Sequence, residues 1–287
     1  MLKIGLSSYS LARAPEMDIV SALRFAAENG AEHMEIVPGS FAELKDMKAP
    51  GLVEKIVTTA KECNLELSSY TIGANFVQPD AAALNAEIER VKGEVEIAAK
   101  LGVTRMRHDC AWRPHEECSY ANFEKELEIF ADACGQIADK AKPYGITTSI
   151  ENHGFYVQAS ERVQRLVLKV NRANFRTTMD VGNFLCVDED PECAAMNNVG
   201  FASMVHFKDF HIRRVVSNPE GYIKTLHGRF IRGAITGDGD VNLAAIVKIL
   251  KNAGYSGFLS IEYEGWDECK SACIRAIKNV KELVANN

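Results

Sequence analysis

Short apolar runs alternate along the chain with longer segments in which apolar residues recur every three or four positions. The short runs predict strands, and the longer segments predict amphipathic helices. The predicted strands span residues 3–7, 33–37, 66–72, 104–108, 146–151, 175–180, 204–208 and 258–262. The predicted helices span residues 17–29, 51–63, 81–101, 119–142, 160–171, 191–198, 241–253 and 267–285.

This alternation of strands and helices indicates βαβ crossovers and a parallel sheet, which places the chain in the α/β class. Eight such units in 287 residues predict a closed (β/α)8 TIM barrel, with residues 1–287 as a single domain. An open doubly wound sheet is the alternative, but no Gly-x-Gly-x-x-Gly turn follows the first strand.

One connection, residues 209–240, is long for a loop between a strand and the next helix. It has little periodicity, and from Lys208 to Arg232 basic residues far outnumber Asp209 and Glu220. We expect an irregular loop on the face of the barrel where active sites are built. It would serve as a lid or subunit contact, or it would capture an anionic group of the substrate.

Composition narrows the class of protein further. Hydrophobic residues make up 47% of the chain and charged residues 25%, which excludes a disordered or collagen-like chain. The net charge of -6 argues against a nucleic-acid partner. No apolar stretch is long enough for a membrane helix, and the N-terminus lacks the pattern of a signal peptide. We therefore expect no membrane partner, a cytoplasmic location and reduced cysteines.

Acidic or imidazole side chains end four consecutive predicted strands: Glu151, Asp180, His206 and Glu262. The ends of neighbouring barrel strands converge, so these side chains should lie close together. Three crowded carboxylates repel one another unless a cation lies between them. Carboxylate and imidazole ligands without thiolates favour one divalent metal ion, Mn²⁺ first, with Mg²⁺, Co²⁺ or Zn²⁺ as alternatives.

The order and spacing of five motifs resemble those of the xylose isomerase-like barrel superfamily, the sugar phosphate isomerase/epimerase group. The motifs are Ile150-Glu151-Asn152-His153-Gly154, Met179-Asp180-Val181-Gly182-Asn183, His206-Phe207-Lys208-Asp209, Gly237-Asp238-Gly239-Asp240 and Ser260-Ile261-Glu262. The resemblance implies that Glu151, Asp180, His206 and Glu262 bind one catalytic metal ion. It also implies that Glu151 and Glu262 act as an acid/base pair on opposite faces of a substrate.

The leading functional hypothesis is a metal-dependent isomerase or epimerase of a small sugar, sugar phosphate or polyol ketone, acting through a metal-stabilised enediolate. Ketose 3-epimerases of the superfamily usually carry His where this chain has Asn183. The alternative is a lyase on a keto-sugar, a keto-cyclitol or a 3-keto-C-glycoside, in which His153 serves as a second base. A non-catalytic sugar- or metal-binding barrel is a minor alternative, and an abasic-site endonuclease is disfavoured.

Several residues near the predicted strand ends are candidates for binding the substrate, which we expect to be a small carbohydrate. They are His108, Trp112, Asn183, Lys208 and Arg232, with Tyr9 and Glu35 as further candidates. By resemblance, a homo-oligomer is expected. A second subunit would be needed if the protein were a C-glycoside deglycosidase.

Overall fold

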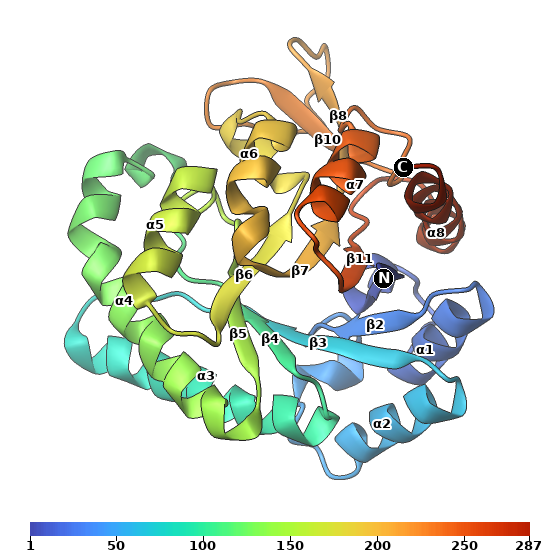
Figure 1. Ribbon diagram of the computed structural model, residues 1–287, viewed down its shortest axis with the longest axis horizontal. Helices are drawn as coiled ribbons and strands as arrows, with labels where there is room; N and C mark the ends of the chain where they lie inside the picture. Colours follow the sequence, from blue (N-terminus) through green and yellow to red (C-terminus); the bar gives the residue numbers. More distant parts are fainter.

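The computed structural model describes residues 1–287, and its centre is a closed barrel of eight parallel strands (Figure 1). The strands follow one another around the barrel in the order β1-β11-β7-β6-β5-β4-β3-β2. They are β1 (Lys3–Ser7), β2 (His33–Ile36), β3 (Glu66–Ile72), β4 (Arg105–His108), β5 (Thr147–Glu151), β6 (Phe175–Asp180), β7 (Ala202–Phe207) and β11 (Phe258–Ile261). Pairing of β1 with β11, from Lys3 opposite Phe258 to Leu6 opposite Ile261, closes the ring. The predicted (β/α)8 barrel is confirmed.

Eight α-helices surround the strands and bury their apolar faces against them (Figure 1). They are α1 (Ile19–Glu28), α2 (Leu52–Glu62), α3 (Ala81–Leu101), α4 (Tyr120–Ala141), α5 (Ser160–Val170), α6 (Pro191–Asn198), α7 (Leu243–Asn252) and α8 (Cys269–Asn286). Side-chain caps fix several starts: Asp18 accepts a hydrogen bond from the Ser21 N–H (2.8 Å) and Asp80 from the Ala83 N–H (2.9 Å). None of the helices combines the length and apolar character needed to cross a membrane.

The connection between β7 and α7 differs from the irregular loop that the sequence predicts. It forms a separate antiparallel sheet of three strands, β8 (Asp209–Arg213), β9 (Ile223–Lys224) and β10 (Phe230–Ala234), in the order β8-β10-β9. Figure 1 shows β8 and β10 beyond the barrel, above α6 and α7 in that view. These strands are too short for a periodic signal, and their register depends on pairing between segments distant in the chain.

Two acidic side chains fasten this three-stranded sheet to the barrel. The Asp209 carboxylate accepts hydrogen bonds from the N–H groups of Gly237 (3.0 Å), Gly239 (2.9 Å) and Val241 (3.1 Å). Asp188, which follows β6, forms an ion pair with Arg229 (2.6 Å). The segment is therefore built into the molecule at both of its ends.

Side-chain alternation along β4 separates two neighbouring residues that end this strand. Arg107 points into the barrel, whereas the His108 ring lies 6.0 Å from the Phe76 ring and 6.2 Å from the Phe175 ring. His108 is fully buried, and its Nδ1 donates to the Asp109 carbonyl (2.7 Å). The structure does not bring His108 to the barrel opening, because adjacent residues of a strand face opposite sides. A substrate contact expected for His108 is therefore replaced by packing.

Burial lowers the pKa of His108 to about 4. In the unfolded chain this imidazole binds a proton near pH 6.5, whereas in the folded protein it stays neutral at that pH. The free energy of unfolding therefore decreases as the pH falls. We predict that wild type loses about 2 kcal/mol more unfolding free energy than His108→Phe between pH 7.5 and pH 5. Urea unfolding of both proteins at the two pH values measures this difference. Parallel losses would contradict a neutral, buried His108.

Candidate metal centre

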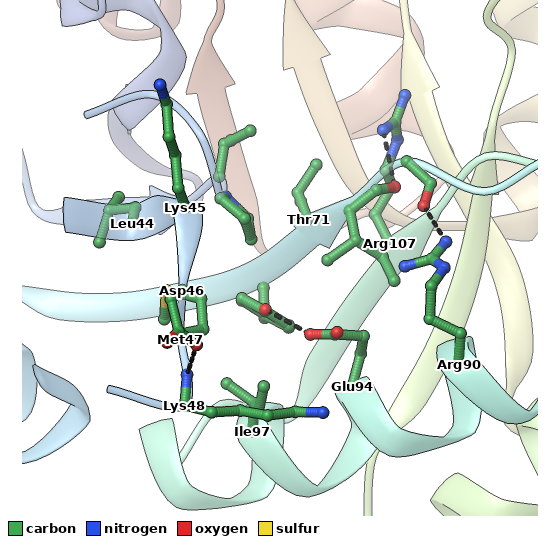
Figure 2. Close-up of a pocket in the computed structure, with 15 residues that line it drawn as sticks. Leu44, Lys45, Asp46, Met47, Lys48, Thr71, Arg90, Glu94, Ile97 and Arg107 are labelled. Atoms are coloured by element: carbon green, nitrogen blue, oxygen red, sulfur yellow. Dashed lines mark hydrogen bonds between the residues drawn. The ribbon is translucent and has the colours of Figure 1, made fainter. Parts of the chain in front are cut away.

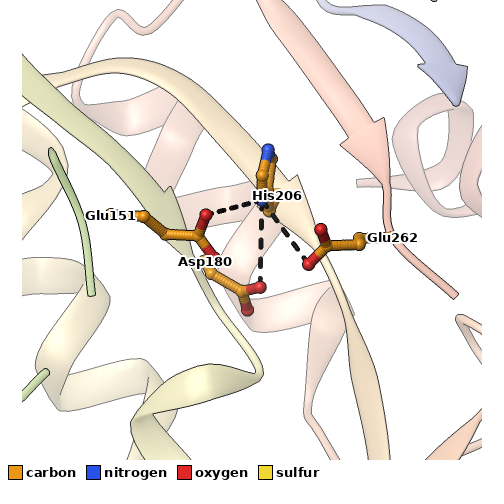
Figure 3. A group of neighbouring side chains, drawn as sticks. All are labelled: Glu151, Asp180, His206 and Glu262. Atoms are coloured by element: carbon orange, nitrogen blue, oxygen red, sulfur yellow. Dashed lines mark ion pairs between the residues drawn. The ribbon is translucent and has the colours of Figure 1, made fainter. Parts of the chain in front are cut away.

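Four side chains converge at the carboxyl ends of the barrel strands (Figure 3). Glu151 ends β5, Asp180 ends β6, His206 lies in β7, and Glu262 directly follows β11. One ligand atom from each lies within 4.8 Å of the others. His206 Nδ1 is 3.4 Å from Glu151 Oε2, 3.7 Å from Glu262 Oε2 and 4.0 Å from Asp180 Oδ2. The structure thus brings together the four residues that the sequence singles out as metal ligands.

The other nitrogen of His206 is held by a buried carboxylate beneath the cluster. Nε2 lies 3.0 Å from Glu35 Oε2, and Glu35 also accepts hydrogen bonds from Ser260 Oγ (3.0 Å) and from Thr71 Oγ1. An Nε2–H that donates to Glu35 leaves the Nδ1 lone pair facing the three carboxylates. A carboxylate behind a histidine ligand is a frequent arrangement at metal sites. Glu35 therefore positions His206.

Asp180 is oriented by the turn that follows β6. Its Oδ1 accepts hydrogen bonds from the N–H groups of Gly182 (2.8 Å) and Asn183 (2.9 Å). Asp180 Oδ2 and His206 Nδ1 are both buried, and neither has a hydrogen-bond partner. Burial, against the opposing effect of Lys208, raises the pKa of Asp180. Two unpartnered ligand atoms that face each other fit a divalent cation, which would satisfy both.

A buried arginine balances part of this negative charge. Arg107 Nε lies 2.7 Å from Glu151 Oε2, and Arg107 Nη2 lies 2.7 Å from Asp109 Oδ1. Burial alone would raise the pKa of Glu151, but Arg107 and His206 outweigh it and hold that pKa well below its usual range. Sequence reasoning missed Arg107 as a functional residue. Side-chain alternation could have drawn attention to it. Arg105 and Arg107 are two residues apart in a short strand, so both should lie on the same face of the sheet.

Lys208 supplies the second buried cation of the cluster. Its Nζ lies 2.6 Å from Glu262 Oε2, 3.3 Å from Glu264 Oε2 and 3.4 Å from Asp180 Oδ2. Asn183 joins the two flanks of the cluster, because its Nδ2 donates to Glu151 Oε1 (2.9 Å) and its Oδ1 accepts from Lys208 (3.3 Å). Both residues, which the sequence suggests for substrate binding, contact the acidic cluster directly.

The loops after β4 and β5 form one wall of the opening. His153 Nδ1 lies 3.0 Å from Asp109 Oδ1, and the His153 side chain remains 49% exposed. A Cβ on Gly154 would lie 3.8 Å from Trp112 Cδ1, so the indole rests beside this glycine. By contrast, Arg232 lies on β10 with its guanidinium 5.3 Å from the centre of the Tyr222 ring, and no contact joins it to the four-residue cluster.

A separate cavity of about 400 Å³ lies between the loop after β2 and helix α3 (Figure 2). Its walls carry both signs of charge, including Lys45, Arg90 and Glu94, and none of the four clustered residues lines it. Arg107 does line it, so this guanidinium separates the cavity from the acidic cluster. We therefore place the chemistry at the cluster rather than in this cavity.

With this geometry in place, comparison with known proteins identifies the family. The sequence profile described as "Xylose isomerase-like TIM barrel" matches residues 23–282. The chain belongs to the xylose isomerase-like TIM barrel family.

Two curated relatives indicate which kinds of protein share sequence with this chain. An inosose dehydratase of Clostridium perfringens is 27% identical over 148 residues, which are 50% of this chain and 50% of that protein. A rhizopine catabolism protein of Rhizobium meliloti is 24% identical, over 70% of this chain and 63% of that protein. The chain therefore matches about half the length of the inosose dehydratases.

Solved structures share the fold along almost the whole chain. A probable 3-DHS dehydratase of Bacillus anthracis has a TM-score of 0.77 and 16% identity, covering 98% of this chain and 99% of its own. A family member from Mycobacterium smegmatis, solved in complex with magnesium, has a TM-score of 0.75 and 15% identity, covering 99% and 97%. A 3-keto-D-glucoside 4-epimerase of E. coli has a TM-score of 0.73 and 14% identity, covering 98% and 100%. The similar proteins thus include dehydratases, which are lyases, and an epimerase.

The arrangement around His206 predicts how metal affinity depends on Glu35. Glu35→Gln keeps the side-chain shape but removes the charge behind His206, and we expect it to weaken Mn²⁺ binding by about 10- to 100-fold. Asp180→Asn should weaken binding further, because it removes a ligand. Isothermal titration of each variant with Mn²⁺ measures both effects.

Glu94→Gln is the matched control, since Glu94 accepts a hydrogen bond from Tyr70 (2.6 Å) outside the cluster. This variant should bind Mn²⁺ as wild type does. Wild-type affinity in Glu35→Gln would refute the positioning role of Glu35.

Proposed function

We propose that this protein is a metal-dependent lyase that removes water from a polyhydroxylated ketone, a keto-cyclitol or keto-sugar. The observation that carries the proposal is an exposed imidazole backed by a carboxylate, His153 and Asp109, at the edge of the acidic cluster. The inosose dehydratase and 3-DHS dehydratase relatives support the same reaction type.

Asp109 prepares His153 to accept a proton from the substrate. Since His153 Nδ1 lies 3.0 Å from Asp109 Oδ1, the Nδ1–H donates to the carboxylate and the lone pair is on Nε2. Asp109 is itself held by Arg107 (2.7 Å). The chain from Arg107 to His153 thus fixes the ring orientation that a general base needs.

The elimination balances with this one base. His153 Nε2 takes a proton from the carbon beside the ketone, and the electron pair of that C–H bond forms the new carbon–carbon double bond. The C–O bond of the neighbouring carbon breaks, and the departing hydroxyl takes the proton from Nε2 and leaves as water. His153 returns to its neutral form, so no oxidant or further reactant is needed.

Buried groups on the other flank stabilise the charge that develops on the substrate. Glu151, Asp180, His206 and Glu262 would hold a divalent cation, Mn²⁺ or Mg²⁺, whose charge polarises the ketone when it is bound. The Lys208 ammonium, between Glu262 and Glu264, supplies a second positive charge beside the same place. These groups are fixed before the substrate arrives, which is what makes electrostatic stabilisation effective.

An epimerase is the second candidate, favoured by Glu151 and Glu262, which approach His206 Nδ1 from different strands (3.4 and 3.7 Å). Epimerisation needs a base on each face of the substrate. Arg107 and Asn183 occupy the Glu151 carboxylate and depress its basicity. Lys208 holds the Glu262 carboxylate in the same way (2.6 Å), so a buried cation engages each member of this pair. The exposed His153 is then the freer base, which favours elimination over an exchange of protons between two carboxylates.

Proton NMR in D₂O separates the two candidates. The Mn²⁺-loaded protein and a metal-stripped control are each incubated with an inosose, 3-dehydroshikimate and a panel of ketoses. For the samples whose spectra are recorded, the protein is loaded with Mg²⁺ in place of Mn²⁺. A new alkene signal with loss of water supports the lyase. Deuterium beside the ketone with the mass otherwise retained would instead establish the epimerase.

We predict that His153→Gln lowers kcat by about 10²- to 10⁴-fold, because it removes the base. The Mn²⁺ affinity of this variant should stay at the wild-type value. His227→Gln, a change of another exposed histidine that pairs with a carboxylate, Asp188 (3.2 Å), is the matched control and should keep its activity. Steady-state kinetics and Mn²⁺ titration test both variants, and an unchanged kcat in His153→Gln would exclude this residue as the base.

A further inference from the structure

Both tryptophans of the chain lie in loops at the carboxyl ends of barrel strands. Trp112 follows β4 and Trp266 follows β11, and their surfaces are 60% and 59% exposed. Single exposed aromatic residues are common on protein surfaces, so the surroundings of each tryptophan rather than its exposure carry the argument. Sequence reasoning singled out Trp112, whereas Trp266 was not among its candidates.

Each indole rests against a glycine in the left-handed conformation. Gly154 (φ +76°) lies beside Trp112, and Gly221 (φ +73°) lies beside Trp266. A Cβ on Gly221 would lie 2.0 Å from Cζ2 and 2.3 Å from Cε2 of Trp266, so no other residue leaves room for this ring. The Trp266 ring therefore packs against backbone while more than half of the residue stays exposed, and this support limits its loss of freedom on binding.

Trp266 is close to the acidic cluster along the chain. Glu262 belongs to the cluster, and the Glu264 carboxylate lies 3.3 Å from Lys208 Nζ. Three residues separate Glu262 from Trp266, and the four steps along the chain span at most about 14 Å. A Cβ on Gly233 of β10 would lie 2.6 Å from the Glu264 carbonyl carbon, so the three-stranded sheet packs against the same loop.

The segment between β7 and α7, which contacts Trp266 at Gly221, also carries an aromatic ring and a guanidinium. Tyr222 follows Gly221, and the Arg232 guanidinium lies 5.3 Å from the centre of the Tyr222 ring. Arg232 forms no ion pair with a carboxylate, so its N–H groups are available to hydroxyl oxygens. An indole face stacks on aryl rings, and it packs equally well on the apolar C–H face of a sugar.

We propose that Trp266, with Tyr222 and Arg232, forms a subsite for a second ring of the substrate. The substrate is then a glycoside-like ketone: its reacting ring lies at the acidic cluster, and an aryl or sugar ring attached to it stacks on Trp266. The placement of the reacting ring rests on the proposed function, whereas the stacking subsite is tested without any turnover.

The two-tryptophan composition allows a direct binding assay. In Trp112→Phe, Trp266 is the sole tryptophan, so its fluorescence reports contact with this ring. The Mg²⁺-supplemented variant is titrated with phenyl β-D-glucoside, cellobiose and myo-inositol, none of which has a ketone. We expect phenyl β-D-glucoside or cellobiose to change the Trp266 emission, and the stronger of the two identifies an aryl or a sugar ring. Myo-inositol, a single ring, should leave the emission unchanged.

Substitutions of Trp266 and Gly221 provide a second test of the subsite. Trp266→Leu should weaken binding of the preferred two-ring ligand by about tenfold or more, measured by isothermal titration, since it removes the stacked indole. Gly221→Ala should do the same by displacing the indole. Tyr144→Leu, a change of an exposed aromatic residue that precedes β5 at the opposite end of the barrel, should leave binding unchanged.

Three results would overturn the subsite: no emission change with either two-ring ligand, wild-type affinity in Trp266→Leu, or an equal response to myo-inositol. The proposed function fails differently. If two-ring ligands bind at Trp266 but no ketone loses water, the dehydratase is refuted and the subsite remains.

Discussion

Crowding of like charges at one end of the barrel is the constraint on which the site depends. Three buried carboxylates, those of Glu35, Glu151 and Asp180, and the partly exposed carboxylate of Glu262 surround the imidazole of His206. Carboxylates so close together cannot all remain ionised without positive charge among them. Arg107 and Lys208 supply part of it from fixed positions. Asp180 Oδ2 and His206 Nδ1 have no hydrogen-bond partner, and they mark the place where a bound cation would supply the remaining positive charge.

The balancing cations engage the carboxylates on both flanks of the cluster, and this shapes the proposed chemistry. Arg107 and Asn183 tie down Glu151 on one flank, while Lys208 lies against Glu262 on the other. A symmetric acid/base pair, expected from the resemblance to sugar epimerases, needs two carboxylates that are free to exchange protons with the substrate. Asn183 stands where those epimerases usually carry histidine, and it bridges the two flanks. The lyase, an alternative at the level of sequence, therefore becomes the preferred proposal.

Much of the fold and of the cluster could be predicted because both follow from simple periodicities. Eight strand–helix units imply a closed barrel, and the ends of its strands converge, so Glu151, Asp180, His206 and Glu262 could be placed together. Side-chain alternation, applied to Arg107 and His108, would also have assigned one to the interior and the other to the helices. The sheet of β8, β9 and β10 could not be found this way. Its strands are short, and Phe230 pairs with Arg213 across a long excursion of the chain.

The hydrogen bonds of Asp209 at the base of that sheet determine how the segment between β7 and α7 can move. The Asp209 carboxylate accepts hydrogen bonds from the N–H groups of Gly237, Gly239 and Val241. It therefore joins the start of β8, which follows β7, to the turn that precedes α7. The start of β8 and the turn before α7 are therefore held at a fixed separation. A displacement of one is passed to the other, so a load placed on the three-stranded sheet reaches the outer ring of helices through Asp209.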